Sequence, residues 1–129
     1  MLNKKEILTS GKIFNPAAKI YANADRVLDY LDNKNPAPVL VEIDPSNTCN
    51  HGCYFCISSY IHLPESKDLE TYDKTVMPRE VLLGACKDFV DMGVRAINWT
   101  GGGEPTINKH LREAITYIGE NSDIKMGIF

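Results

Sequence analysis

The chain has 129 residues, of which 43% are hydrophobic and 24% are charged, and its formal net charge is −3. This composition is ordinary for one globular domain, and it shows no basic stripe of the kind that binds nucleic acid. No stretch approaches the ~20 apolar residues of a membrane span, and the first thirty residues lack a signal-peptide core. We therefore expect a cytoplasmic protein that neither enters a membrane nor binds nucleic acid.

Apolar residues recur at helical spacing from Pro16 to about Leu31, with charged residues on the other faces. The stretch from Asn33 to Pro38 ends this helix, because proline cannot continue one. We expect residues 1–38 to form an extension whose amphipathic helix packs on a main domain of residues 39–129.

The remaining chain alternates short β-branched segments with amphipathic segments of helical period. Strands are expected at 39–43, 94–100 and 124–129, and helices at 78–93 and from about 108 to 119. This order predicts an α/β fold in which crossovers place the strands in parallel. Ligands bind such folds at the carboxyl ends of the strands. Three strands cannot close a barrel and the last would be an unprotected edge, so we expect a fragment of a longer protein.

The first strand is followed by CNHGCYFC, residues 49–56, in which three cysteines are spaced C-x3-C-x2-C. Thiolates ligate iron–sulfur clusters, zinc and copper(I). A structural zinc site usually takes four ligands, and the chain has no second C-x-x-C. Three thiolates would leave one iron of a cubane cluster without a protein ligand. The fourth cysteine, Cys86, lies on an apolar helical face and is expected in the core.

Other uses of these residues remain open. A small structural zinc module would recruit His51 or His62 as fourth ligand, and Cys53 with Cys56 could form a thiol redox pair. GGGEP, residues 101–105, could by itself be a tight turn. We expect the polar segment from Cys56 to Met77 to be an exposed excursion.

Several other polar and aromatic side chains near these loops have an ordinary structural explanation. We expect His51, Tyr54 and Trp99 to pack near the site, and Glu42 and Asp44 to be solvated carboxylates at the end of the first strand.

Both motifs occur in order, the cysteine loop after one strand and the Gly-Gly-Glu-Pro turn after the next. Together with the aromatic residue directly before Cys56, this arrangement resembles the radical S-adenosylmethionine (radical SAM) superfamily over about residues 39–129. The resemblance implies a partial (β/α)6 TIM-like barrel with about its first three strands present, preceded by an N-terminal helix.

The resemblance also implies roles for individual residues. The cysteines Cys49, Cys53 and Cys56 would ligate three irons of a [4Fe–4S] cluster, and the fourth iron would chelate S-adenosylmethionine. Phe55 would lie near the adenine, and Gly102, Gly103 and Glu104 would contact the methionine amino group.

The activity implied is reductive cleavage of S-adenosylmethionine to a 5′-deoxyadenosyl radical, which abstracts hydrogen from a small-molecule or peptide substrate. An electron donor such as flavodoxin or ferredoxin would be the partner. Because the later strands of the barrel carry substrate contacts in this superfamily, we expect this chain alone to be an inactive fragment.

Overall fold

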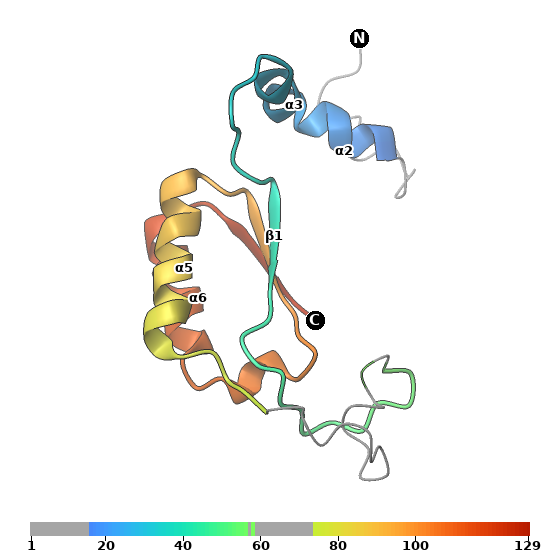
Figure 1. Ribbon diagram of the computed structural model, residues 1–129, viewed down its shortest axis with the longest axis vertical. Coiled ribbons are helices and arrows are strands. Elements are labelled where there is room, and N and C mark those ends of the chain that lie inside the picture. The colour runs from blue at the N-terminus through green and yellow to red at the C-terminus, as the bar shows by residue number, and fades with distance from the viewer. Residues whose placement is uncertain (1–15, 57, 59–73) are drawn as a thin grey trace. The chain divides into compact units, whose positions relative to one another are not determined.

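The computed structural model describes residues 16–56, 58 and 74–129 (Figure 1). The sequence-based expectations for residues 1–15, for His62 and for most of the polar segment after Cys56 lie outside the described residues. The chain divides into two compact units, Met1–Val39 and Leu40–Phe129.

The second unit is built on a three-stranded parallel sheet in the order β1-β2-β3 (Figure 1). Its elements in chain order are β1 (Leu40–Ile43), α5 (Arg79–Met92), β2 (Ala96–Trp99), the 3-10 turn η2 (Pro105–Ile107), α6 (Leu111–Asn121) and β3 (Lys125–Ile128). The mixed α/β class and the parallel pairing predicted from the sequence are thus confirmed. The order of elements brings the segments that follow β1 and β2 to one edge of the sheet.

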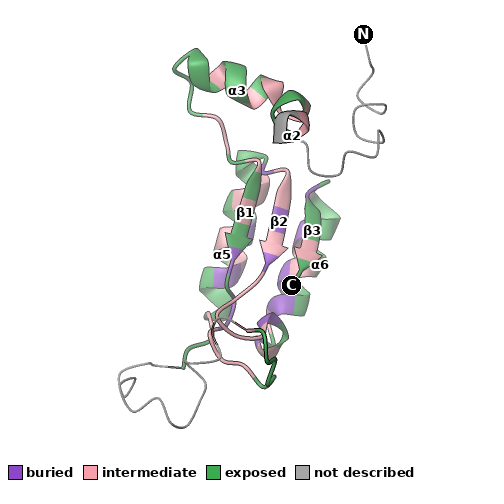
Figure 2. Cartoon of the chain, turned by 90° about the vertical axis from the view of Figure 1, so that its right-hand side faces the viewer, coloured by how far each residue is buried: buried purple, intermediate pink, exposed green. Residues whose placement is uncertain are grey.

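Both α5 and α6 cover the same face of the sheet (Figure 2). The core lies between these layers and consists of Ile43, Leu82, Cys86, Val94, Ile97, Trp99, Leu111, Ala114, Ile118 and Ile124. Full burial of a large aliphatic side chain contributes about 1.5–3 kcal/mol, so this layer holds the two helices on the sheet. Cys86 is fully buried, as its place on the apolar helical face predicted.

The bounds of α5 agree with the sequence signals, because Pro78 precedes the helix and Gly93 ends it in the left-handed conformation with φ of 72°. The start of α6 was predicted too early, at about residue 108. Pro105–Ile107 form η2 instead, and Asn108 takes extended backbone geometry with φ of −71° and ψ of 105°, so α6 begins at Leu111.

The first unit contains α2 (Pro16–Ala22) and α3 (Ala24–Leu31) where one continuous helix was expected. The side-chain amide of Asn23 donates to the Lys19 carbonyl at 2.9 Å, in the place of the backbone bond that a continuous helix would make. The Asn23 N–H turns to the Ile20 carbonyl at 3.1 Å. Asparagine often competes with the helix in this way, and here it divides the segment in two. The packing of this helix pair on the sheet unit stays a prediction.

In the part of the chain that the structure describes, no helix is both long and apolar enough to cross a membrane.

Candidate metal and cofactor site

The cysteine loop and the GGGEP turn leave the sheet side by side, because β1 and β2 are neighbours and run in parallel. The Thr100 N–H donates to the Ile43 carbonyl at 3.0 Å, so the two chains stay paired one step beyond the strands. The two segments singled out in the sequence therefore begin together at the carboxyl edge of the sheet (Figure 1).

The backbones of the two loops are in direct contact. The Glu104 N–H donates to the Thr48 carbonyl at 2.9 Å, one residue before Cys49. A Cβ on Gly103 would lie 2.2 Å from the Thr48 carbonyl oxygen, and one on Gly101 would lie 2.8 Å from the Ser46 carbonyl oxygen. Only glycine allows backbones to approach this closely, so the glycines of the turn are required by its contact with the cysteine loop.

The start of the cysteine loop is held by Ser46, which is 2% exposed. The Ser46 hydroxyl accepts from the Thr48 N–H at 3.0 Å and donates to the Thr48 carbonyl at 3.2 Å. Serine hydroxyls commonly fix a turn in this way. Ser46 therefore also orients the Thr48 carbonyl, which accepts the hydrogen bond from the Glu104 N–H.

The Glu104 carboxylate is held by its own segment. One oxygen accepts from the Thr106 hydroxyl at 2.5 Å and from the Thr106 N–H at 3.1 Å. The other oxygen lies 3.4 Å from Nε2 of His51 in the cysteine loop. Hydrogen bonding by Thr106, first from its hydroxyl and then from its N–H, lowers the pKa of Glu104, with a smaller contribution from His51. A carboxylate that stays charged suits an ammonium ligand.

The three clustered cysteines are free thiols on one loop. Cys49 and Cys56 are partly buried and Cys53 is exposed. Three contacts shape the loop: the Cys49 sulfur accepts from the His51 N–H at 3.4 Å, the Cys49 thiol donates to the His51 carbonyl at 3.8 Å, and the Cys56 N–H donates to the Cys53 carbonyl at 3.1 Å. Within residues 16–56, 58 and 74–129, no three His, Cys, Asp or Glu side chains are gathered closely enough to hold a metal ion. The donor set itself, three accessible thiols in one short loop, fits a thiolate-ligated cluster.

The aromatic residues of the loop lie at the surface. Phe55 is 75% exposed and Tyr54 is 95% exposed, and their rings meet edge to face with centroids 5.1 Å apart. Tyr54 therefore does not pack as expected, because its only ring contact among the described residues is Phe55, which is itself exposed. Trp99 is fully buried in the core, which confirms its expected packing role.

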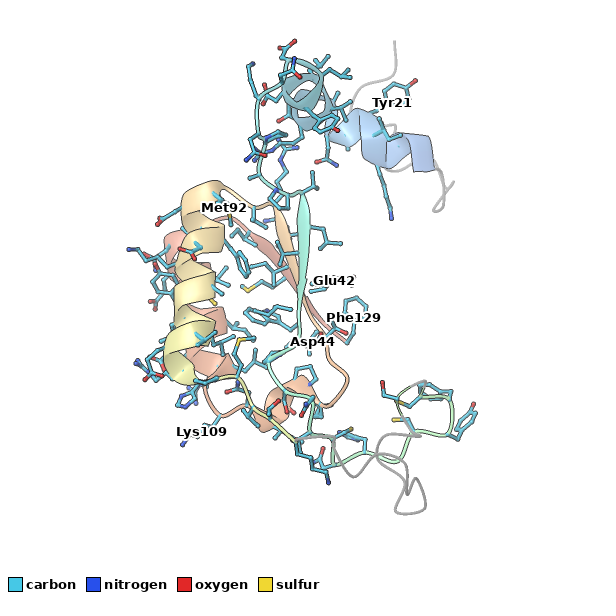
Figure 3. All side chains as sticks on the ribbon, viewed as in Figure 1. Tyr21, Glu42, Asp44, Met92, Lys109 and Phe129 are labelled. Carbon is cyan, nitrogen blue, oxygen red and sulfur yellow. The ribbon has the colours of Figure 1, made fainter. Side chains whose placement is uncertain are left out.

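The two carboxylates at the end of β1 are exposed, as expected. Glu42 accepts from the Asn98 side-chain amide at 3.4 Å, which is a long contact. Figure 3 shows Glu42 and Phe129 on the side of the sheet away from α5 and α6.

Asn108 was missed by the sequence reasoning. It is 1% exposed, and its amide donates to the carbonyls of Pro45 and Met77, both at 3.0 Å. Its carbonyl oxygen accepts from the His110 N–H at 3.0 Å. An asparagine just before a helix signals a cap, and that signal could have drawn attention to it. Its contacts with distant loops could not be found in this way.

The segment that leads into α5 pairs with the segment that leads into the cysteine loop. Ser46 and Val76 form an antiparallel bridge, the Met77 N–H donates to the Pro45 carbonyl at 2.9 Å, and the Asn47 N–H donates to the Thr75 carbonyl at 3.1 Å. The Asn47 side chain accepts from the Thr75 N–H at 2.6 Å. Residues 45–47 and 75–77 are thus anchored to each other at the carboxyl edge of the sheet.

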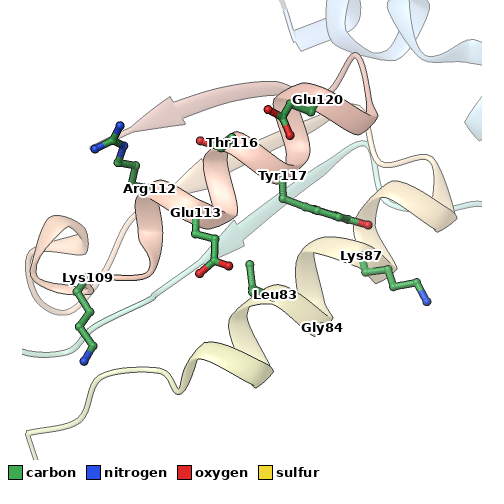
Figure 4. Close-up of a pocket in the computed structure, with 9 residues that line it drawn as sticks. All are labelled: Leu83, Gly84, Lys87, Lys109, Arg112, Glu113, Thr116, Tyr117 and Glu120. Atoms are coloured by element: carbon green, nitrogen blue, oxygen red, sulfur yellow. The ribbon is translucent and has the colours of Figure 1, made fainter.

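A groove of about 710 Å³ lies between α5 and α6 (Figure 4). It is lined by Leu83, Gly84, Lys87, Lys109, Arg112, Glu113, Thr116, Tyr117 and Glu120. The lining mixes both signs of charge, and Glu113 is paired with Arg79 through an Nε–Oε2 contact of 2.8 Å. No cysteine and no residue of the GGGEP turn lines it, so the groove is separate from the candidate site.

The comparison with protein families agrees with this geometry. The model of the family described as "Radical SAM superfamily" matches residues 43–129, which include the cysteine loop, the GGGEP turn and the whole sheet beyond β1. No curated protein and no solved structure matches the chain significantly. Since the match covers more than half of the 129 residues, the chain belongs to the radical SAM superfamily.

Proposed function

We propose that this chain provides the cluster-binding part of a radical SAM enzyme of the cytoplasm. Cys49, Cys53 and Cys56 would ligate three irons of a [4Fe–4S] cluster and leave the fourth iron for a ligand. Two observations support the proposal: the thiols share one loop, and none is engaged in a disulfide. The cluster and S-adenosylmethionine are the cofactors that members of this superfamily typically use.

The proposed S-adenosylmethionine site lies between the two loops. Gly102, Gly103 and Glu104 would contact the amino group of its methionine, and Phe55 would lie near its adenine. The observation that carries the proposal is the hydrogen bond from the Glu104 N–H to the Thr48 carbonyl at 2.9 Å. This bond joins Glu104, in the turn that would bind the amino group, to Thr48. Thr48 directly precedes Cys49, the first proposed iron ligand.

We propose further that β1, β2 and β3 are the first strands of a (β/α)6 TIM-like barrel. Two observations support this: the pairing is parallel throughout, and both helices cover one face (Figure 2). The opposite face would then line the interior of the barrel. Membership in the superfamily supports a TIM-like fold as well.

When bound, the reduced cluster would supply one electron that cleaves S-adenosylmethionine to methionine and a 5′-deoxyadenosyl radical, which abstracts hydrogen from substrate. The protein binds and orients the reactants. The Glu104 carboxylate, kept charged by Thr106, would pair with the amino group. The substrate would be a small molecule or a peptide, and the reductant an electron-transfer protein such as flavodoxin or ferredoxin.

The test is anaerobic reconstitution of the full chain with iron and sulfide, in the wild type and in two variants that each replace one cysteine by alanine. The wild type and Cys86→Ala should each bind about four irons, because Cys86 is buried in the helix layer. Cys53→Ala should lose the cluster, since two thiolates do not hold it. Comparing Cys53→Ala with Cys86→Ala distinguishes the loss of a proposed iron ligand from the general effect of removing a cysteine.

A zinc ion retained by the wild type and by Cys86→Ala in place of iron, and lost by Cys53→Ala, would contradict the proposal. That outcome would favour the structural zinc module, in which the same loop holds a metal without redox chemistry.

A further inference from the structure

The segment from Glu104 to Asn108 holds the start of the cysteine loop at two points. At one end of η2, the Glu104 N–H donates to the Thr48 carbonyl at 2.9 Å. At the other end, the Asn108 amide donates to the Pro45 carbonyl at 3.0 Å. The short 3-10 turn between them is a spacer, begun by Pro105 and closed by the bond from the Asn108 N–H to the Pro105 carbonyl at 3.1 Å.

The second contact is buried, while the first lies nearer the surface. Asn108 is 1% exposed, and Pro45 and Pro105 are also among the fully buried side chains. A buried amide that lost its partners would carry the full cost of desolvation, so the Asn108 side chain has a strong preference for this geometry. Glu104 and Thr48, which form the first contact, are only partly buried.

The same amide reaches a third segment. Its second N–H donates to the Met77 carbonyl at 3.0 Å, and Met77 itself donates to Pro45 at 2.9 Å. Asn108, Pro45 and Met77 therefore form a closed set of contacts. This set links the start of the cysteine loop, the segment returning to α5 and the segment between η2 and α6.

From these contacts we propose that Asn108 is a positioning residue for the S-adenosylmethionine site. By holding Pro45, it sets where the chain from Pro45 to Cys49 runs relative to Glu104. The proposal rests on the proposed function, in which Cys49 would ligate the cluster and Glu104 would bind the amino group of S-adenosylmethionine. Asn108 touches neither reactant and acts through the placement of these two residues.

The first experiment measures this placement in the metal-free full chain, so that it does not depend on the proposed function. Asn108→Ser is compared with Ile118→Ala, which removes apolar volume from the buried face of α6, the helix that follows Asn108. Hydrogen exchange of the Glu104 amide reports its bond to Thr48. We expect exchange to be about tenfold faster in Asn108→Ser than in Ile118→Ala at matched distance below each melting temperature.

The second experiment uses the reconstituted full chain and S-adenosylmethionine as the probe. The electron paramagnetic resonance spectrum of the reduced cluster is titrated with S-adenosylmethionine. We expect Asn108→Ser to keep its iron content but to bind the probe about 10- to 100-fold more weakly, which is the range over which residues outside the ligands change the affinity or activity of metal sites. Ile118→Ala should bind it like the wild type.

Equal amide exchange in the two variants would overturn the proposal, as would equal affinity for S-adenosylmethionine in variants that both hold the cluster. If Asn108→Ser does not fold, Asn108→Thr serves in its place, because its hydroxyl supplies one donor in place of two and its methyl group fills more of the buried space. A wild type without a cluster would count against the proposed function, while the exchange experiment would still decide the role of Asn108 in placing the two loops.

Discussion

Gly103 lies so close to Thr48 that a Cβ built on it would stand 2.2 Å from the Thr48 carbonyl oxygen. The neighbouring atoms are all backbone, at 2.5 Å for the carbonyl carbons of Asn47 and Thr48. These backbone atoms cannot move away by a change of rotamer, as the end of a flexible side chain could. The approach of the GGGEP turn to the cysteine loop is therefore possible only without a side chain at position 103.

Gly103→Ala should push the two loops apart and weaken the response of the reduced cluster to S-adenosylmethionine. Overpacking of this kind also costs about 1–3 kcal/mol of stability. The control is Gly52→Ala within the cysteine loop, where a Cβ meets nothing within 4 Å. Spectral titration and denaturant unfolding of both variants check the prediction, and equal behaviour of the two would refute the steric argument.

Thr106→Val should change stability in a pH-dependent way. The Thr106 hydroxyl is the main cause of the lowered pKa of Glu104. A carboxyl whose folded pKa is lowered contributes stability at pH values above its usual pKa, and this contribution is lost as pH falls through the folded value. The wild type should therefore be more stable than Thr106→Val at neutral pH, with a difference that shrinks in acid.

Urea unfolding at a series of pH values measures this difference. Thr116→Val, an exposed threonine on α6, is the matched control and should show a difference independent of pH. A Thr106→Val difference that stays constant into the acidic range would show that the hydroxyl does not stabilise the charged form of Glu104.

The four cysteines should react with iodoacetamide at two different rates in the metal-free chain. Burial raises the pKa of the Cys86 thiol from 9.0 to about 11, which leaves about 100-fold less of the reactive thiolate. Cys49, Cys53 and Cys56 lie at least partly at the surface. Peptide mass spectrometry should find these three modified first and Cys86 modified only in denaturant. Early modification of Cys86 would mean that the helix layer opens readily.

The fold was predictable from the sequence where local signals decide it. The period of the apolar residues placed both helices of the sheet unit, and Gly93 marked the end of α5 because a left-handed residue is needed there. The same reasoning failed where contacts between distant segments decide. Asn108 lies 63 residues from Pro45 and 31 from Met77, so no local pattern shows that these partners hold it out of α6.

The candidate site shows the same division. The cysteine spacing and the GGGEP turn identified the residues, since thiolate chemistry and glycine geometry belong to single segments. The hydrogen bond that joins the segments, from Glu104 to Thr48, depends on the pairing of β1 with β2 and could only be expected in outline. The antiparallel bridge of Ser46 with Val76 had no sequence signal, because neither residue lies in a strand-like run.

The cysteine loop and the GGGEP turn are proposed to bind S-adenosylmethionine together, at an open iron. The most direct measurement is electron–nuclear double resonance of the reduced cluster in the reconstituted full chain, with S-adenosylmethionine carrying ¹⁵N in its amino group. We predict a coupling to this nitrogen that is lost in Gly103→Ala and kept in Gly52→Ala. A chain that assembles its cluster but shows no coupling to the labelled nitrogen would contradict the account.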